Sequence, residues 1–414
     1  MAGISASPGD VVIDELTITP KIGNPVNIKN QVLMMDIFES IFSPSLYAEF
    51  FLYDPIDMIN TLPVRGEEII DLSYHLPGGQ TSTWQFAVVQ IAHSYPGNQD
   101  KAKFYTLKCF TVDHFVNAKQ KFSKKYTDNS STVIQSILKN QLGSAKNLIS
   151  EPTKGIQDIL IAKMFPFQAI DLVRRRSVSS SFLSSSYCFF ENQKGYNFQT
   201  IEGMMSKNSK NIGNKVFTYD ASVLQNARDV GFRNILAYRH LQHGNSWQMI
   251  NAGVFNNRVT KFDFFTKTKF TVDYKNTEKQ GNFKWSDGTS FPWNSPQFEG
   301  ENNDTTPQFF FVPADSSRPE NYISEAIGPQ LAYTAQMAQN ITQISVYGDN
   351  SIDVGDVITA TLPENTGFTK KVEEAKLVTG NFLVSKVRHT ITLQQNLYYK
   401  MSLELMKGRI MTNV

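Results

Sequence analysis

Two histidines, His240 and His243, are three positions apart and could act as metal ligands. On a helix, this spacing would place both imidazole rings on one face, where they could bind a divalent cation. No third ligand with a recognisable spacing stands nearby in the sequence. We therefore expect a solvated or packed histidine pair and no metal site.

A thiol nucleophile needs a cysteine paired with a histidine, and Cys109 and His114 supply both residue types. Cys109 lies in an apolar stretch typical of a strand, where a thiol is usually buried and inert. The same expectation holds for Cys188 in the segment SSYCFFEN. With only two cysteines, the chain lacks both a disulfide framework and a four-cysteine zinc site, which favours a reducing site of synthesis.

The sequence contains none of the motifs GxSxG, GxxxxGK[ST] or HExxH, which mark common hydrolases, nucleotide-binding proteins and metalloproteases. Pairs of carboxylates, such as Asp36/Glu39 and Glu67/Glu68, could in principle serve glycoside hydrolysis. A chain with 38 acidic residues contains many such pairs, and solvated strand edges or contacts between subunits explain them. We expect no enzyme, and no catalytic, cofactor-binding or metal-binding residue.

Arg174-Arg175-Arg176 is the strongest local concentration of charge. It could line a lumen or contact an acidic partner. A solvated helix end, where positive side chains complement the helix dipole, also explains it. Both interpretations stay open at this stage.

The composition favours β-structure and assembly over binding to nucleic acid. The 414 residues, 41% of them hydrophobic, are enough for several cores. Lys and Arg number 40 against 38 Asp and Glu, so the net charge of +2 creates no field that attracts DNA or an anionic membrane. Aromatic residues reach 12% and charged residues only 19%, a balance that suits strands and interfaces.

Neither a leader nor a membrane span is expected. The N-terminal segment has no basic region followed by an apolar one, and no stretch approaches the roughly 20 apolar residues that a spanning helix needs. We expect a protein that is soluble when made.

Residues 28–115 are typical of one small antiparallel β domain, preceded by an N-terminal arm at 1–27. Apolar runs between residues 27 and 53 flank Ser43 and Pro44, which predicts strand, turn and strand. A short helix is expected at Pro55–Leu62. Ile70, Leu72 and Tyr74 alternate and should share one face of a strand. Further strands are predicted at Trp84–Ser94 and Lys103–Thr111.

Residues 116–205 predict an α+β middle domain. Apolar residues recur at helical spacing through Thr132–Gln141 until Gly143 ends the helix. A second helix is predicted at Pro166–Val178. The strand pair that follows turns at Asn192–Gly195, where glycine supplies a positive φ.

Residues 206–275 and 326–414 predict a second β domain, with 276–325 as a loop-rich insertion. Thr218–Gln242 begins with the periodicity of a helix or an irregular packing segment, and strands are expected within Trp247–Tyr274. A helix at Ala326–Gln339 precedes four strands. These are expected at Gln343–Gly348, Val357–Thr361, Leu377–His389 and Tyr398–Met406.

The second β domain contains a pattern similar to one in the first. The run GNFLVSKVRHTIT followed by YYKMSLELM is similar to TWQFAVVQIAHSY followed by KFYTLKCFTVD. In both, an apolar strand carries a histidine and a second strand follows after a short loop. This similarity predicts a duplicated β domain with inserted segments.

Several segments together resemble the central baseplate hub of contractile-tailed bacteriophages, whose fold is shared by the hub portion of the VgrG spike proteins of type VI secretion. They are the opening NIKNQVLMMDIFESIFSPSLYAEFFLYDP with VRGEEIIDLSY, the middle FPFQAIDLVRRRSVSSSFLSSSYCFFENQKGYNFQTIEGMM, and the closing SVYGDNSIDVGDVITATLP, GNFLVSKVRHTIT and YYKMSLELMKG. The resemblance covers most of residues 28–410. The 276–325 insertion has no place in the family pattern, and no spike repeat follows Val414.

The resemblance implies an α+β, mainly β fold, with two similar tail-tube-like antiparallel β-barrel domains and inserted α+β domains. It implies a homotrimeric ring that presents a pseudo-sixfold face to the hexameric tail tube, holds the trimeric central spike and leaves a channel for DNA ejection. Baseplate wedge proteins and the tape measure protein are further implied partners. The implied location is the virion tail baseplate, after synthesis in the host cytoplasm.

The resemblance also implies contact segments. The loop at Ser40–Ser45 and the segment Pro55–Arg65 would face a neighbouring subunit or the next ring, with a counterpart near Gly253–Phe262. Surface turns without any partner are an equally good explanation for each position.

Two alternative functions follow from other features. Trp285, Phe291 and Trp293 of the insertion could stack on sugar rings, as in a cell-wall carbohydrate-binding or wall-hydrolysing tail component. A tail tube or tail completion protein is the other alternative, although such a chain normally needs a single β domain.

Overall fold

The computed structural model describes most of the chain, and the account below concerns these residues alone. They are residues 8–62, 64–77, 79, 81–96, 102–182, 184–209, 215–220, 231–243, 256–263, 265–275, 283–284, 307–311, 320–338, 340–363, 379–394, 397–407 and 410–411.

The N-terminal β unit is an antiparallel sheet with a short helix beside it. Its strands lie in the order β3-β4-β7-β6-β5-β1-β2. Ile70, Leu72 and Tyr74 of β5 are each at most 1% exposed, which confirms the shared buried face predicted from their alternation. The elements are β1 (Val12–Thr19), β2 (Val26–Asn27), β3 (Val32–Ser40), β4 (Tyr47–Asp54), α1 (Met58–Thr61), β5 (Ile69–His75), β6 (Thr81–Pro96) and β7 (Lys103–Thr111).

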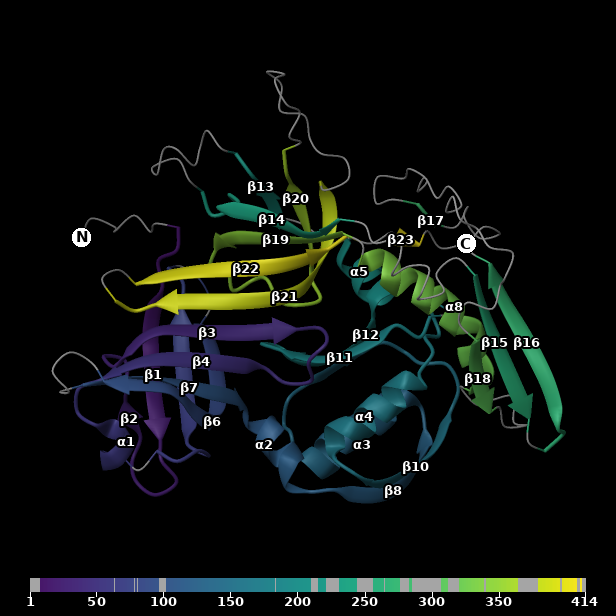
Figure 1. The fold of residues 1–414 in the computed structure, drawn as a ribbon, viewed down its shortest axis with the longest axis horizontal. Coiled ribbons are helices and arrows are strands. Elements are labelled where there is room, and N and C mark those ends of the chain that lie inside the picture. Colours follow the sequence, from purple (N-terminus) through teal and green to yellow (C-terminus); the bar gives the residue numbers. More distant parts are fainter. Residues whose placement is uncertain are drawn as a thin grey trace.

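The middle unit combines helices with two small sheets (Figure 1). It has its own hydrophobic core. β8 pairs with β10, while β11 and β12 form a hairpin that β9 joins in parallel. The predicted helices and hairpin are confirmed, since Gly143 at φ 67° ends the first helical segment and Gly195 at φ 125° closes the turn. The elements are α2 (Val112–Lys119), β8 (Phe122–Asp128), α3 (Ser130–Ile137), a π-helical turn η2 (Leu138–Leu142), β9 (Leu148–Ser150), β10 (Gln157–Met164), α4 (Pro166–Arg175), β11 (Tyr187–Asn192), β12 (Gly195–Thr200) and α5 (Ile201–Ser209).

The C-terminal β unit is a second antiparallel arrangement, in the order β14-β19-β22-β21. β20 pairs with the first part of β21, and β13 lies parallel to β20. The predictions for Val357–Thr361 and Tyr398–Met406 agree with β20 and β22 at both ends. The elements are β13 (Val216–Thr218), β14 (Ala237–His243), β19 (Asn340–Tyr347), β20 (Val357–Thr361), β21 (Gly380–Thr392) and β22 (Tyr398–Met406).

The long helix α8 packs against a small, separate sheet. β15 pairs antiparallel with β16 and parallel with β18, and Val259 of β15 packs in one cluster with Ile323 and Ala326 of α8. Figure 1 shows α8 running from the C-terminal β unit along this sheet. The elements are β15 (Asn256–Asp263), β16 (Thr268–Lys275), β17 (Phe283–Lys284), β18 (Pro307–Phe311), α8 (Glu320–Met337) and β23 (Ile410–Met411), which pairs with β17.

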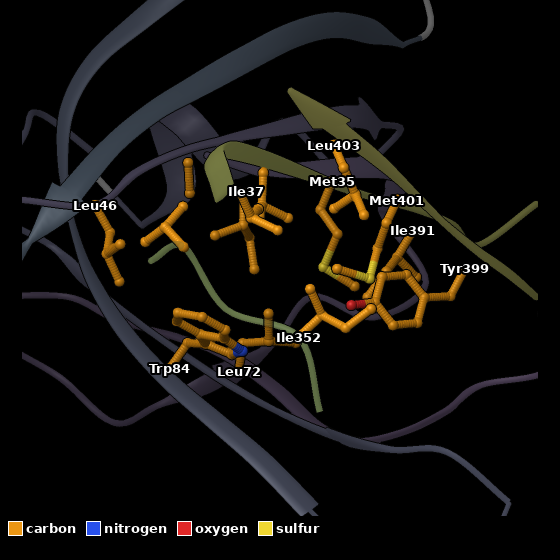
Figure 2. Packing of buried hydrophobic residues seen from close by; sticks show 14 of the residues in the cluster. Met35, Ile37, Leu46, Leu72, Trp84, Ile352, Ile391, Tyr399, Met401 and Leu403 are labelled. Carbon is orange, nitrogen blue, oxygen red and sulfur yellow. The ribbon is translucent and has the colours of Figure 1, made fainter. Parts of the chain in front are cut away.

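The two β units are joined edge to edge into one sheet. β21 pairs with β3 from Lys386 opposite Ser40 to Thr392 opposite Met34. Figure 2 shows the result, with Met35 and Ile37 of β3 in the same packed cluster as side chains from β21 and β22. The cluster shown includes Leu46, Leu72, Trp84, Ile352, Ile391, Tyr399, Met401 and Leu403. Half-buried alternating strands of both units therefore cover a common core.

Two assignments made from the sequence need correction, and a third is only partly covered by the described residues. Within the segment 1–27, assigned to an arm, β1 pairs with β5 and buries Leu16 and Ile18 at 0% and 1% exposure. Within the 276–325 insertion, expected to have little regular structure, β18 adds a parallel strand to β15. The Thr218–Gln242 stretch, expected to begin as a helix or an irregular packing segment, ends in strand β14, which pairs with β19, and residues 221–230 lie outside the described residues.

Candidate assembly interface

The junction between the β units is fixed by a buried acidic group. Asp36 of β3 is 3% exposed and accepts two hydrogen bonds from Arg388 of β21, from Nε at 2.9 Å and from an Nη at 2.8 Å. The hydroxyl of Thr390 donates a third at 2.6 Å. A forked Arg–carboxylate pair is among the most geometrically specific contacts in proteins, and it raises the pKa of Arg388. The pair therefore fixes the register of β3 against β21.

The opposite face of the same junction is also polar. Glu39 of β3 is 2% exposed and accepts a hydrogen bond from the backbone N–H of Val354 at 3.3 Å. Its Oε1 lies 3.5 Å from Nε2 of His389, whose Nδ1 lies 2.7 Å from the hydroxyl of Tyr399. Burial, followed by the neighbouring Tyr74, raises the pKa of Tyr399 well above its usual range. Solvated strand edges or contacts between subunits were the expected surroundings of Asp36 and Glu39, and the structure instead buries both inside the chain at this junction.

The hairpin β11–β12 of the middle unit reaches the same region. Lys194 at its tip pairs with Asp353 at 2.5 Å, and Asp353 is 3% exposed. Burial, together with the charge of Glu39, raises the pKa of Asp353 to about 6 despite the lysine. All three parts of the chain thus meet around β3 and β21.

The seam between the first β unit and the middle unit also contains a buried carboxylate. Glu191 of β11 is 2% exposed and accepts hydrogen bonds from the Thr111 hydroxyl at 2.7 Å and from Lys146 Nζ at 2.5 Å. Burial raises its pKa, and the lysine opposes that rise. A cleft of about 360 Å³ opens here, bordered by Trp84 and Asp113 as well.

The two β units repeat the same strand order. In the first, the strands run β3-β4-β7-β6 with β5 on the first half of β6, and in the second they run β14-β19-β22-β21 with β20 on the first half of β21. Each long strand also has an irregularity at the same place, between Val88 and Gln90 in β6 and between Val384 and Lys386 in β21. The duplication suggested by the sequence similarity between these strand pairs thus has a matching topology.

In each β unit, the second half of the long strand and the strand at the far end of the unit have edges that could pair with another unit. The described chain makes this pairing once. The second half of β21 pairs with β3, but β6 pairs with β5 only through Thr81–Ala87. At the other end of the sheet, β14 pairs among the described strands with β19 alone. An open edge offers unpaired backbone donors and acceptors and is a template for another strand.

The outward face of the first unit carries contacting aromatic rings. Tyr47 lies between Phe38 and Phe110, at ring-centroid distances of 5.6 and 5.0 Å. Phe104 contacts Tyr95 at 5.4 Å and Phe51 at 6.0 Å. Half-exposed aromatic rings on a sheet surface are typical of a contact surface.

The candidate residues Cys109, Cys188 and His114 are packed within the fold. Cys109 is fully buried in β7, and burial raises its pKa strongly. Cys188 is also buried, and burial raises its pKa to about 12. His114 stacks on Phe110 at 4.3 Å and has Nδ1 3.0 Å from the Ser45 hydroxyl. Since a thiolate is the reactive form, the expectation of inert thiols is supported.

The histidine pair is not on a helix. His240 and His243 belong to β14, whose pairing with β19 shifts by one residue between His240 and Gln242, so that His240 lies opposite Thr342 and His243 opposite Asn340. His240 Nδ1 lies 3.0 Å from the hydroxyl of Thr342. Across the described residues, no group of three or more His, Cys, Asp or Glu side chains could hold a metal ion.

The remaining charged candidates are explained locally. Glu68 accepts hydrogen bonds at 2.8 Å from the backbone N–H groups of Arg65 and Gly66, while Glu67 pairs with Lys21 at 3.5 Å on the surface. In α4, Arg174 and Arg175 pair with Asp171 at 2.6 and 2.7 Å, and Arg174 also donates to the carbonyl of Tyr187. These arginines thus stabilise the end of a helix.

The three segments predicted to contact a neighbouring subunit lie in different parts of the fold. Ser40–Ser45 is the β3–β4 loop, where Phe42 is 55% exposed and borders a pocket with Phe167 and Arg174. Pro55–Arg65 includes α1, beside which Ile56 is 59% exposed. Of Gly253–Phe262, the part from Asn256 is β15, and residues 253–255 lie outside the described residues. Trp285, Phe291 and Trp293 also lie outside them.

Sequence reasoning missed the residues that join the units. Asp36 and Arg388 are 352 positions apart, and no local pattern links them. The one available signal was the similarity between the β6–β7 and β21–β22 segments, which indicates equivalent sheet positions. In the part of the chain that the structure describes, no helix is long and apolar enough to cross a membrane.

Comparisons with known proteins identify the fold. No family model matches the chain, and no curated protein matches it either. Among solved structures, the tail protein from Neisseria meningitidis MC58 matches with a TM-score of 0.57 and 10% identity, over 95% of this chain and 96% of that one. The 43 kDa tail protein of prophage MuSo2 from Shewanella oneidensis matches with a TM-score of 0.53 and 9% identity, over 95% and 98%.

At these identities the likeness shows the fold. The chain has the mainly β, α+β fold of phage tail proteins over nearly its whole length, as the sequence resemblance predicted.

Proposed function

We propose that this chain is the structural baseplate hub of a contractile phage tail. In this proposal three copies form a ring that joins the hexameric tail tube to the trimeric central spike and leaves a channel for DNA ejection. The observation that carries it is the repeat of one strand order in a single continuous sheet. Three copies of a chain with two equivalent units present six similar units, so a threefold object can match a sixfold one.

The shared fold supports the location and the partners of this proposal. Two proteins with the same fold over nearly their full lengths are tail proteins by name, which favours a place in the virion tail. The proposed partners are further copies of the chain, the tail tube, the central spike, baseplate wedge proteins and the tape measure protein. The proposed role is structural and needs no catalysis.

The experiment is to measure the mass of the purified protein by light scattering and to image the same sample by negative-stain electron microscopy. The expected result is a particle of about 140 kDa, three times 46.8 kDa, with a ring-shaped, sixfold-looking view and an open centre. A stable monomer at every concentration, with no ring in the images, would contradict the proposal.

A further inference from the structure

The β15–β16 hairpin carries aromatic and basic residues at its tip. We propose that this tip binds the surface of a lipid bilayer that contains anionic phospholipid, with the rings of Phe265 and Phe270 in the interfacial region and the ammonium groups of Lys267 and Lys269 at the head groups. This inference goes beyond the proposed hub and does not depend on it.

The turn of the hairpin lies beyond the part of the sheet that packs against α8. Val259 packs in one cluster with residues of α8, and Val272 lies opposite Val259. From there the hairpin continues through four more pairs and ends with Asp263 opposite Thr268. At about 3.4 Å per residue, these pairs extend roughly 14 Å. Figure 1 shows the turn past the end of α8, on the side of the molecule away from the first β unit.

The side chains of the protruding part are exposed. Phe265 is 82% exposed and Phe270 is 54% exposed, and each residue from Thr266 to Lys269 is exposed as well. Successive residues of a strand point to opposite faces, so water reaches both faces of β16 here. A single exposed aromatic residue is common on proteins. Two of them on one projecting turn give the molecule a local apolar contact surface.

The exposed charge at the tip is positive. Lys267 and Lys269 are exposed, whereas the two acidic residues of the hairpin are engaged within it. Asp263 is 8% exposed and accepts hydrogen bonds from a backbone N–H and a hydroxyl group of the turn, at 2.9 and 2.7 Å. Asp273 accepts two from Arg258, at 2.7 and 3.1 Å. The tip is therefore basic, although the whole chain has a net charge of only +2.

Phenylalanine beside lysine fits the surface of an anionic bilayer. A phenylalanine ring has no polar atom, so it is stabilised when it leaves water for the boundary between head groups and acyl chains. Lysine keeps its ammonium group at the head groups while its stem lies along apolar surface, and anionic lipids attract it. Single-stranded nucleic acid is instead bound in a basic groove, and the hairpin borders neither of the two pockets described above. A projecting turn needs only a flat surface.

The experiment is flotation of the full chain with vesicles of phosphatidylcholine alone and with vesicles that also contain phosphatidylglycerol. The expected binding is about tenfold tighter to the vesicles with phosphatidylglycerol, because two lysines face anionic head groups. A higher salt concentration should weaken the binding only in part, since salt screens the charges and leaves the burial of the rings.

Two double variants separate the contributions of the rings and the charges. Phe265→Ser with Phe270→Ser should weaken the binding about tenfold at every salt concentration. Lys267→Gln with Lys269→Gln should remove the preference for phosphatidylglycerol and most of the salt dependence. All four positions are exposed, so thermal unfolding of both variants should match that of the parent chain.

Matched controls change the same residue types elsewhere. Phe42→Ser removes a ring that is 55% exposed, and Lys124→Gln with Lys125→Gln removes two exposed charges of β8. Both controls should bind vesicles as the parent chain does. Loss of binding in the lysine control as large as in the hairpin variant would assign the effect to overall charge and overturn the inference.

A fluorophore at the tip reports its insertion. Phe265→Cys labelled with an environment-sensitive dye should shift its emission to the blue when vesicles with phosphatidylglycerol are added. Lys139→Cys, at an exposed position of the middle unit, should show no shift with the same dye. Cys109 and Cys188 are buried and give little background labelling.

Several results would overturn the inference. They are no flotation with either vesicle, equal flotation with both, and flotation that the hairpin variants leave unchanged. Binding of a labelled oligonucleotide that depends on the hairpin, measured by fluorescence anisotropy in the absence of vesicle binding, would assign the tip to nucleic acid and overturn it too. The particle mass and the images that test the hub are independent of all these results.

Discussion

Asp36 on β3 and Arg388 on β21 form a forked hydrogen-bonded pair across 352 residues of sequence. Arg388 is about half exposed while Asp36 is buried, so among the described residues this arginine is the cation paired with the buried carboxylate of Asp36. Loss of this contact between the two β units would therefore affect the buried Asp36 far more than the half-exposed Arg388.

Replacing Arg388 by Ala should destabilise the chain by about 1–3 kcal/mol, because Asp36 then stays buried with only the Thr390 hydroxyl as donor. Arg388→Lys should recover part of this, since it keeps the charge and loses the fork. Urea denaturation gives the free energy of unfolding. Lys386→Ala, which removes an exposed pair with Glu404, is the matched control and should cost less than about 1 kcal/mol. Equal costs for the two alanine variants would contradict this account.

Asp353 should make stability fall with rising pH. Its folded pKa of about 6 lies above the roughly 3.9 of an unfolded aspartate. The protonated form is thus favoured by folding, and its contribution is complete below about pH 4 and lost as the pH rises through 6. Asp353→Asn should reduce the loss of unfolding free energy between pH 4 and 6.5. An unchanged pH slope in the variant would refute the assignment.

The Glu191–Lys146 pair should behave as a coupled unit. Lys146→Met leaves the buried Glu191 without its cation and should cost about 1–3 kcal/mol, whereas adding Glu191→Gln should restore at least half of that loss. Chemical denaturation of both single variants and the double variant completes the cycle. As a control, Lys125→Met removes a surface pair with Asp158 and should cost less than about 1 kcal/mol. Additive losses within the cycle would show that the pair is not coupled.

Gly195 should resist substitution more than Gly143, although both have positive φ. A Cβ at Gly195 would lie 2.5 Å from the carbonyl oxygen of Asn147, while one at Gly143 meets nothing within 4 Å. Gly143→Ala should cost about 1 kcal/mol for the backbone conformation alone. Gly195→Ala should cost at least twice as much, because the backbone must also move. Thermal or urea unfolding distinguishes them, and equal losses would contradict the predicted clash.

Local patterns in the sequence were sufficient for most individual elements. The alternation of Ile70, Leu72 and Tyr74 predicted a strand face correctly, and the apolar spacing before Gly143 predicted a helix. Such patterns depend only on neighbours within a few residues. Local spacing could not show whether His240 and His243 lie on a helix or a strand, because their segment pairs with β19, about 100 residues away in the sequence.

The candidate interface could not be predicted in the same way, because it forms where strands distant in the sequence pair with each other. Nothing near Asp36 or Glu39 in the sequence indicates that they are buried, since acidic residues in strands usually face solvent. Their burial follows from β21, which covers β3 once the C-terminal unit is in place. The similarity between the β6–β7 and β21–β22 segments was the only feature of the sequence that contained information about this arrangement.

The pairing of β3 with β21 also has a consequence for synthesis. β3 is made early, whereas the part of β21 that pairs with it is made about 350 residues later. At the usual translation rates of roughly 5–20 residues per second, the nascent chain exposes the edge of β3 for about 20–70 s. An unpaired strand edge is a template for aggregation, so the edge of β3 is a hazard to the newly made chain until its last strands emerge.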